Sequence, residues 1–236
     1  MGSTRLPGKS MIEIGGKPLI KHLIERTRAT TLIDQIVVAT TTNPLDDPLA
    51  SYVLNDLGVA VFRGSERDVL ERYAAAAQFY GGDIIVRLTG DDPLKDPDVI
   101  DTVIETLIKG NGQYDYVSNT IIPTYPEGLD CEAFFTGALL LAANEATDFF
   151  DREHVTPYFY KNQNKFRCFN VSLPQENYSH IRWTLDTTAD LDYFISLYTL
   201  LDDKKITPWR ETLSLVSANE KLALLNRHSC RSDRYK

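Results

Sequence analysis

Between residues 12 and 110, segments with apolar side chains at helical spacing alternate with short runs of β-branched residues. The expected helices cover 18–30, 43–58, 65–81 and 97–110, and the expected strands cover 33–41, 59–64 and 83–94. Such alternation is typical of an α/β domain in which helices cover both faces of a mostly parallel sheet. Sheets of this kind bind ligands at the carboxyl ends of their strands. The sequence therefore predicts a functional site where "VVATT", "VFRG" and "VRLTGDD" end.

The pattern changes after residue 114. Extended segments broken by Pro and Gly, one helix and several aromatic stretches reach to about 180, and helical patterns return from 188. We expect one domain over 1–200 that carries a β-rich arm at about 120–180. A helical tail is expected to follow at 201–236.

The bulk composition restricts the class of protein. The 236 residues carry a formal net charge of −8, and the three cysteines are widely spaced without a CxxC pair. These values disfavour a general binder of nucleic acid, a disulfide framework and a zinc site. No apolar run is long enough to span a membrane, and no signal peptide is visible. We therefore expect a cytoplasmic protein without nucleic-acid or membrane partners.

Two strand-like segments end in acids. "VRLTGDD" ends in Asp91 and Asp92, and "HIRWTLD" ends in Asp186. Carboxylates at such places suit Mg²⁺, which takes one or two of them together with substrate phosphates. The same aspartates are also common N-caps of the helices that follow. Each segment alone leaves both interpretations open, and a shared ion requires Asp91 and Asp186 to converge.

The opening "MGSTRLPGKS" combines glycines with two cations. Gly2 and Gly8 allow the backbone to approach a ligand closely, and Arg5 can grip phosphate oxygens with two donors. Lys9 can act as a point charge on a polyphosphate. The alternative interpretation is a basic tail without fixed structure. Together with the strand-end acids, the loop indicates metal-assisted chemistry on a nucleotide phosphate.

These segments, with "IGGKPLI", "RGSERDVLERY", "YPEGLDCE" and "DREHVTPY", resemble the cytidylyltransferase family. The most similar branch is that of spore coat polysaccharide biosynthesis, and the sialic acid and 3-deoxy-manno-octulosonate cytidylyltransferases are wider relatives. The resemblance runs from residue 1 to about 200. It implies a three-layer nucleotidyltransferase fold, a homodimer, and a Mg²⁺-dependent reaction in which CTP and a sugar give a CMP-sugar and pyrophosphate.

The resemblance also implies roles for particular residues. Arg5, Lys9 and Asp91 would be catalytic, and Asp91 and Asp186 would hold Mg²⁺. Nucleotide contacts would come from Gly2, Ser3, Arg5, Gly8, Lys9, Arg63, Ser65 and Asp91. Sugar contacts would come from Glu127, Asp130, Arg152, Glu153 and His154, although His154 could equally be a structural histidine.

One departure from the family concerns its first strand. Relatives have a strand and an Ala-Arg pair before the loop, whereas Met1 already lies inside it. We expect that strand to be missing, with weakened folding and CTP binding that upstream codons would restore. Three functions therefore stay open: a CTP-dependent enzyme, an enzyme using another nucleoside triphosphate, and a non-catalytic remnant that pairs with an intact paralogue.

Overall fold

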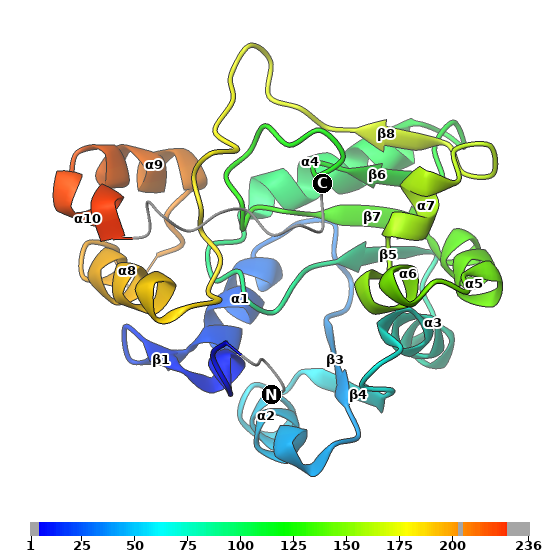
Figure 1. Ribbon diagram of the computed structural model, residues 1–236, viewed down its shortest axis with the longest axis horizontal. Helices are drawn as coiled ribbons and strands as arrows, with labels where there is room; N and C mark the ends of the chain where they lie inside the picture. Colours follow the sequence, from blue (N-terminus) through cyan, green and yellow to red (C-terminus); the bar gives the residue numbers. More distant parts are fainter. Residues whose placement is uncertain (1–4, 203–204, 226–236) are drawn as a thin grey trace.

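The computed structural model describes residues 5–202 and 205–225, and the strands within them form three separate sheets. The largest has four strands in the order β5 (Ile84–Arg87), β7 (Glu132–Phe135), β6 (Tyr116–Ser118) and β8 (Cys168–Asn170). The others are a parallel pair, β3 (Val37–Thr41) with β4 (Ala60–Gly64), and a short hairpin, β1 (Glu13–Ile14) with β2 (Lys17–Pro18). Figure 1 shows β5 above the β3–β4 pair, with helices on both sides.

The four-stranded sheet is mostly parallel, as expected, with one reversed strand. β7 runs antiparallel to both β5 and β6, and β6 pairs in parallel with β8, so β5, β6 and β8 point the same way. Antiparallel neighbours need no helical crossover, and the chain passes from β6 to β7 through the irregular segment 119–131. The helix–strand alternation that predicted parallel strands stops before this segment.

Alternate residues of β6 and β7 face opposite layers of the fold. Val117 and Ala133 pack with the apolar face of α4 (Pro97–Lys109). Tyr116 and Phe134 pack with α3 (Val69–Tyr80) and α5 (Thr136–Glu145) on the other side. The arrangement is the expected three-layer α/β fold, with the sheet between two helical layers.

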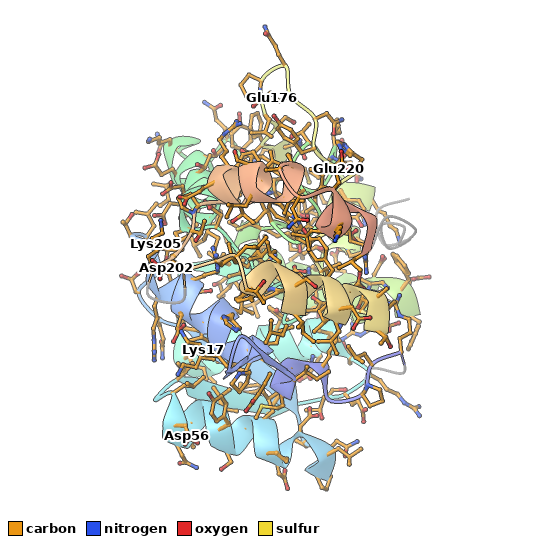
Figure 2. All side chains as sticks on the ribbon, turned by 90° about the vertical axis from the view of Figure 1, so that its left-hand side faces the viewer. Lys17, Asp56, Glu176, Asp202, Lys205 and Glu220 are labelled. Atoms are coloured by element: carbon orange, nitrogen blue, oxygen red, sulfur yellow. The ribbon has the colours of Figure 1, made fainter. Side chains whose placement is uncertain are left out.

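The remaining helices lie around these layers. Beside the β3–β4 pair, a separate apolar cluster joins α1 (Leu19–Arg28), α2 (Asp47–Ser51), the π-helical turn η3 (Tyr52–Asp56) and Val59. The short turns η1 and η2 cover Lys9–Met11 and Pro44–Asp46. At the other end lie α8 (Thr188–Tyr198), α9 (Trp209–Ser217) and α10 (Glu220–Leu225). Figure 2 faces this end and shows α8 between α9 and the N-terminal segment. In the part of the chain that the structure describes, no helix is long and apolar enough to cross a membrane.

The region 120–180 is not the β-rich arm that the sequence led us to expect. β7 and β8 belong to the central sheet, and α5, α6 (Phe149–His154) and α7 (Pro157–Lys161) lie between them. The aromatic residues of "TPYFYKNQNKF" cause this difference, because a single helical turn places them against the sheet. The ring of Phe159 is fully buried and stacks on Tyr116 with centroids 5.1 Å apart.

Two residues of suitable type precede α3, and Asp68 rather than Ser65 is its N-cap. The Asp68 side chain accepts from the backbone N–H of Glu71. Ser65 lies one turn earlier, where its hydroxyl accepts from the backbone N–H of Asp68 at 3.0 Å. Both residues are strong capping types, so the pattern alone did not distinguish them.

Two segments remote in sequence cross beside the sheet at Gly128. Glu127 forms an isolated parallel bridge with Arg182, and the Trp183 amide donates to the Glu127 carbonyl at 2.7 Å. The backbone of Gly128 has φ of 103°, and a Cβ built there would lie 2.2 Å from the Trp183 carbonyl oxygen. Only glycine fits this crossing.

Replacement of Gly128 by alanine is therefore expected to lower the free energy of unfolding by about 2–3 kcal/mol, through overpacking against a buried backbone. Urea denaturation measures the change. Gly137→Ala is the matched control, because Gly137 lies in α5 and its added Cβ meets no atom within 4 Å. The control is expected to be neutral or stabilising, since alanine favours helix over glycine. Equal stability of the two variants would contradict the close crossing.

Candidate active site

Lys9 lies between two carboxylates from distant parts of the chain. Its Nζ donates to Oδ2 of Asp91 at 2.8 Å and to Oδ1 of Asp186 at 2.7 Å. The lysine begins η1, and the preceding Gly8 has φ of 70°, in the left-handed region that glycine adopts readily. The opening loop and both acidic segments therefore meet at one point.

Backbone contacts hold Asp91 and Asp186 side by side. The amide of Leu185 donates to the carbonyl of Asp91 at 2.9 Å. Asp91 comes shortly after β5, and Asp186 comes just before α8, where Thr187 and Asp190 form a capping box. The backbone amide of Asp186 donates to Oδ2 of Asp190 at 3.0 Å. The two predicted acids do converge, although loops rather than paired strands bring them together.

Arg182 holds this arrangement from the inside. Its side chain is 5% exposed and forms ion pairs with Glu127 at 2.9 Å, Asp186 at 3.0 Å and Asp190 at 3.2 Å. We did not expect this role from the sequence. The sequence does contain one indication of this ion pair, because Arg182 and Asp186 lie four residues apart in "HIRWTLD". The strand-like pattern of the segment drew attention away from that spacing.

The charges at the site reinforce one another. Burial alone would lower the pKa of Lys9, but the carboxylates of Asp91 and Asp186 outweigh it and hold that pKa above its usual value. Burial would likewise raise the pKa of Asp186, but Lys9 and Arg182 hold it below its usual value. Lys9 and Asp186 are therefore both charged near neutral pH.

The donor set fits a magnesium ion that shares its coordination with a substrate. Oxygens of Asp91 and Asp186 approach one cationic nitrogen at 2.8 and 2.7 Å, so a single cation can reach both carboxylates. Within residues 5–202 and 205–225, no three His, Cys, Asp or Glu side chains gather as a complete metal site. Mg²⁺ commonly takes one or two carboxylates and completes its shell with water and phosphates.

Asp92 has a different position from its neighbour Asp91. It is buried and accepts from Nζ of Lys95 at 2.8 Å, and Lys95 is itself fully buried. Burial raises the pKa of Asp92, and the Lys95 ammonium opposes that change. The pair of adjacent acids in "TGDD" therefore divides into one carboxylate at the site and one in the interior.

The other candidate nucleotide contacts occupy two places. Arg5 is exposed, and its guanidinium lies 3.2 Å from Oδ2 of Asp186. Gly2 and Ser3 lie outside the described residues. Arg63 joins the carboxyl ends of β3 and β4, because it donates to the Thr41 carbonyl at 2.7 Å and pairs with Asp47 at 2.6 Å. Ser65 follows β4 as the turn into α3 described above.

The candidate sugar contacts divide in the same way. Glu127 is buried and reaches Asp186 through Arg182, and the backbone carbonyl of Asp130 accepts from Lys95. Arg152, Glu153 and His154 instead lie on α6. Arg152 pairs with Asp68 at 2.6 Å, and it donates to the carbonyls of Ala143 and Ala146. His154 packs edge-on against Phe150 with centroids 4.4 Å apart. The side-chain contacts of Arg152 therefore join α6 to the start of α3 and to the end of α5.

A cavity of about 740 Å³ opens beside Lys9 and Asp91. Residues of β3 and β5 line it from both sides, and α1, α3 and α4 close it. Among the described residues, β3 pairs only with β4 and β5 pairs only with β7, so neither strand has a ladder partner on the cavity side. Most of its lining is aliphatic, including Ile24, Val38, Val86 and Ile104, so the cavity is a gap in the core between two strand edges, and Lys9 and Asp91 are also among its lining residues.

Comparison with known proteins identifies the family. The sequence profile described as Cytidylyltransferase matches residues 1–222. The chain belongs to the cytidylyltransferase family. The match includes Lys9, Asp91, Arg182 and Asp186, which are the residues that the fold brings together.

Members of the family and proteins of the same fold are similar over most of the chain. The spore coat polysaccharide biosynthesis protein SpsF of Bacillus subtilis is 31% identical over 234 residues, which cover 97% of this chain and 91% of that protein. A solved cytidylyltransferase of Leptospira borgpetersenii superposes with a TM-score of 0.90 at 30% identity, covering 98% of this chain and 95% of that one. A CMP:2-keto-3-deoxy-manno-octonic acid synthetase complexed with CTP shares the fold, with a TM-score of 0.60 at 18% identity over 84% of this chain and 95% of that one.

Proposed function

We propose that this chain activates a sugar with CTP, giving a CMP-sugar and pyrophosphate. Membership of the cytidylyltransferase family supports the choice of nucleotide, and the named role of the Bacillus subtilis relative supports a product used for a polysaccharide or glycan. The observation that carries the proposal is the meeting of Lys9 with Asp91 and Asp186.

The reaction is an in-line displacement at phosphorus. A sugar hydroxyl oxygen bonds to the α-phosphorus, the bond from that phosphorus to the β-phosphate oxygen breaks, and the hydroxyl proton leaves to solvent. Negative charge builds on the departing pyrophosphate, so positioned cations lower the barrier. Lys9 and Arg5 would supply that charge from the loop. Asp130 would contact the sugar, and Glu127 would act on the site through Arg182. A homodimer is part of this proposal.

Asp91 and Asp186 would hold a magnesium ion. When bound, such an ion neutralises charge on the phosphoryl oxygens and helps to orient the triphosphate. Arg182 keeps the Asp186 carboxylate in place, and the contact between Leu185 and Asp91 keeps the two acids together.

A thermal melt with Mg²⁺ and each of CTP, UTP, GTP and ATP tests the proposal. Nucleotide at about a hundred times its Kd stabilises the folded protein by roughly 2.7 kcal/mol. For a chain of this size we expect CTP, and none of the other three nucleotides, to raise Tm by about 5–10 °C. A second assay then measures CTP-dependent pyrophosphate release with a panel of sugars. A Tm increase with another nucleotide would instead identify that nucleotide as the substrate. No response to any of the four would favour the non-catalytic remnant.

A further inference from the structure

Lys9 occupies the two oxygens that a bridging cation needs. Its ammonium contacts Oδ2 of Asp91 and Oδ1 of Asp186, whereas Arg5 and Arg182 approach Asp186 through Oδ2. The Lys9 side chain is 17% exposed, so solvent can reach it.

Charge and size prevent simultaneous occupation. Four carboxylates (Asp91, Glu127, Asp186 and Asp190) share three cations (Arg5, Lys9 and Arg182), so the cluster keeps a formal charge of −4 + 3 = −1. A divalent cation would neutralise the carboxylates of Asp91 and Asp186 and would be repelled by an ammonium held on the same oxygens. Mg²⁺ also needs oxygen contacts of about 2.0–2.1 Å in near-octahedral geometry, for which the seated ammonium leaves no room.

We infer that the Lys9 ammonium occupies the cation site between Asp91 and Asp186 until a divalent cation replaces it. Asp91 and Asp186 would hold the cation, and the released Lys9 would turn to the triphosphate. The destination of Lys9 rests on the proposed function, whereas its displacement does not. Lys9 stays protonated throughout, and no covalent bond changes.

The exchange couples cation binding to nucleotide binding. Without the cation, the Lys9 ammonium pairs with Asp91 and Asp186 and cannot contact phosphate. With the cation, one more positive charge becomes available to the nucleotide, so each ligand strengthens the binding of the other. Arg5, four residues before Lys9, pairs with Asp186 and can therefore move together with Lys9.

Binding of Mn²⁺ without nucleotide, followed by electron paramagnetic resonance, is the first test. Lys9→Met removes the competitor and is expected to bind Mn²⁺ roughly tenfold more tightly than the unaltered protein. Lys17→Met is the matched control, because it changes net charge equally, but Lys17 pairs with Glu25 at 2.9 Å on the face shown in Figure 2. The control is expected to stay within about twofold. Unchanged or weaker Mn²⁺ binding by Lys9→Met would overturn the exchange.

Acetylation of lysine amines by acetic anhydride, read by mass spectrometry, tests the unaltered protein. Mg²⁺ alone is expected to raise the labelling rate of Lys9 severalfold relative to Lys17, and CTP added with Mg²⁺ is expected to lower it again. A Lys9 rate that Mg²⁺ leaves unchanged would refute the exchange, even if CTP stabilises the protein. Exposure by Mg²⁺ without any effect of CTP would retain the exchange and refute the proposed nucleotide.

Discussion

Asp91→Asn is expected to lower CTP-dependent pyrophosphate release by a factor of about 10²–10³, because under the proposed function it removes one of the two carboxylates that would hold Mg²⁺ beside the reacting phosphates. Asparagine has nearly the same shape, so the backbone contact between Leu185 and the Asp91 carbonyl is retained. Steady-state kinetics with saturating CTP and Mg²⁺ measure the loss. Since the substitution also removes a partner of Lys9, the dependence on Mg²⁺ concentration should weaken together with the rate.

Asp92→Asn is the adjacent control for this experiment. Its carboxylate pairs with the buried Lys95, so the substitution leaves a buried ammonium without its charge partner and should cost about 3–5 kcal/mol of stability. The rate per folded molecule is expected to stay within roughly tenfold of the unaltered enzyme. Asp92 pairs with Lys95, so its substitution leaves the carboxylates of Asp91 and Asp186 unchanged. Equal losses per folded molecule in both variants would place the two acids in one catalytic unit and contradict their separation.

Arg182→Met is expected to lower the free energy of unfolding by about 3–5 kcal/mol. The substitution leaves the carboxylates of Glu127, Asp186 and Asp190 together in a buried place without their shared cation. For a chain of this length the change corresponds to a fall in Tm on the order of 10 °C. Urea denaturation near pH 7 measures it directly.

The loss in Arg182→Met should depend on pH with a defined sign. Lys9 and Arg182 hold the pKa of Asp186 below its usual value, so this carboxylate stabilises the fold above about pH 4 and loses that effect as pH falls through its folded pKa. The variant and the unaltered protein should therefore approach each other in acid. Arg210→Met is the control, because Arg210 and Glu176 form an exposed pair and their loss should cost no more than about 1 kcal/mol. A pH-independent difference would assign the effect to packing alone.

The local pattern of the sequence predicted most of the helices, because periodicity of apolar residues is a short-range signal. α4 illustrates this, with Pro97 in its first turn and an apolar face that recurs every three or four residues. The order and direction of the strands depend on contacts between residues far apart in the chain. The position of β7 between β5 and β6 could not be read from any one segment.

The candidate site shows the same division. Asp91 and Asp186 could be selected because each ends a strand-like run, and Lys9 because it lies in a glycine-flanked basic loop. Their direct contact could not be predicted, because it depends on three segments up to 177 residues apart. Arg182 was missed because its partner Glu127 is 55 residues away and alternation in "HIRWTLD" indicated only a strand.

The break in the sheet beside the cavity has a consequence for how the molecule opens. No ladder hydrogen bond joins β3 and β4 to the four-stranded sheet within the described residues, and these two strands pack on their own apolar cluster with α1 and α2. Side-chain packing and chain connections are what hold the two parts together there. The β3–β4 part can therefore unfold as a cooperative unit of its own, at a lower free energy than the rest of the protein. Such an opening would release Arg63 and the ends of both strands while leaving Asp91 joined to Asp186.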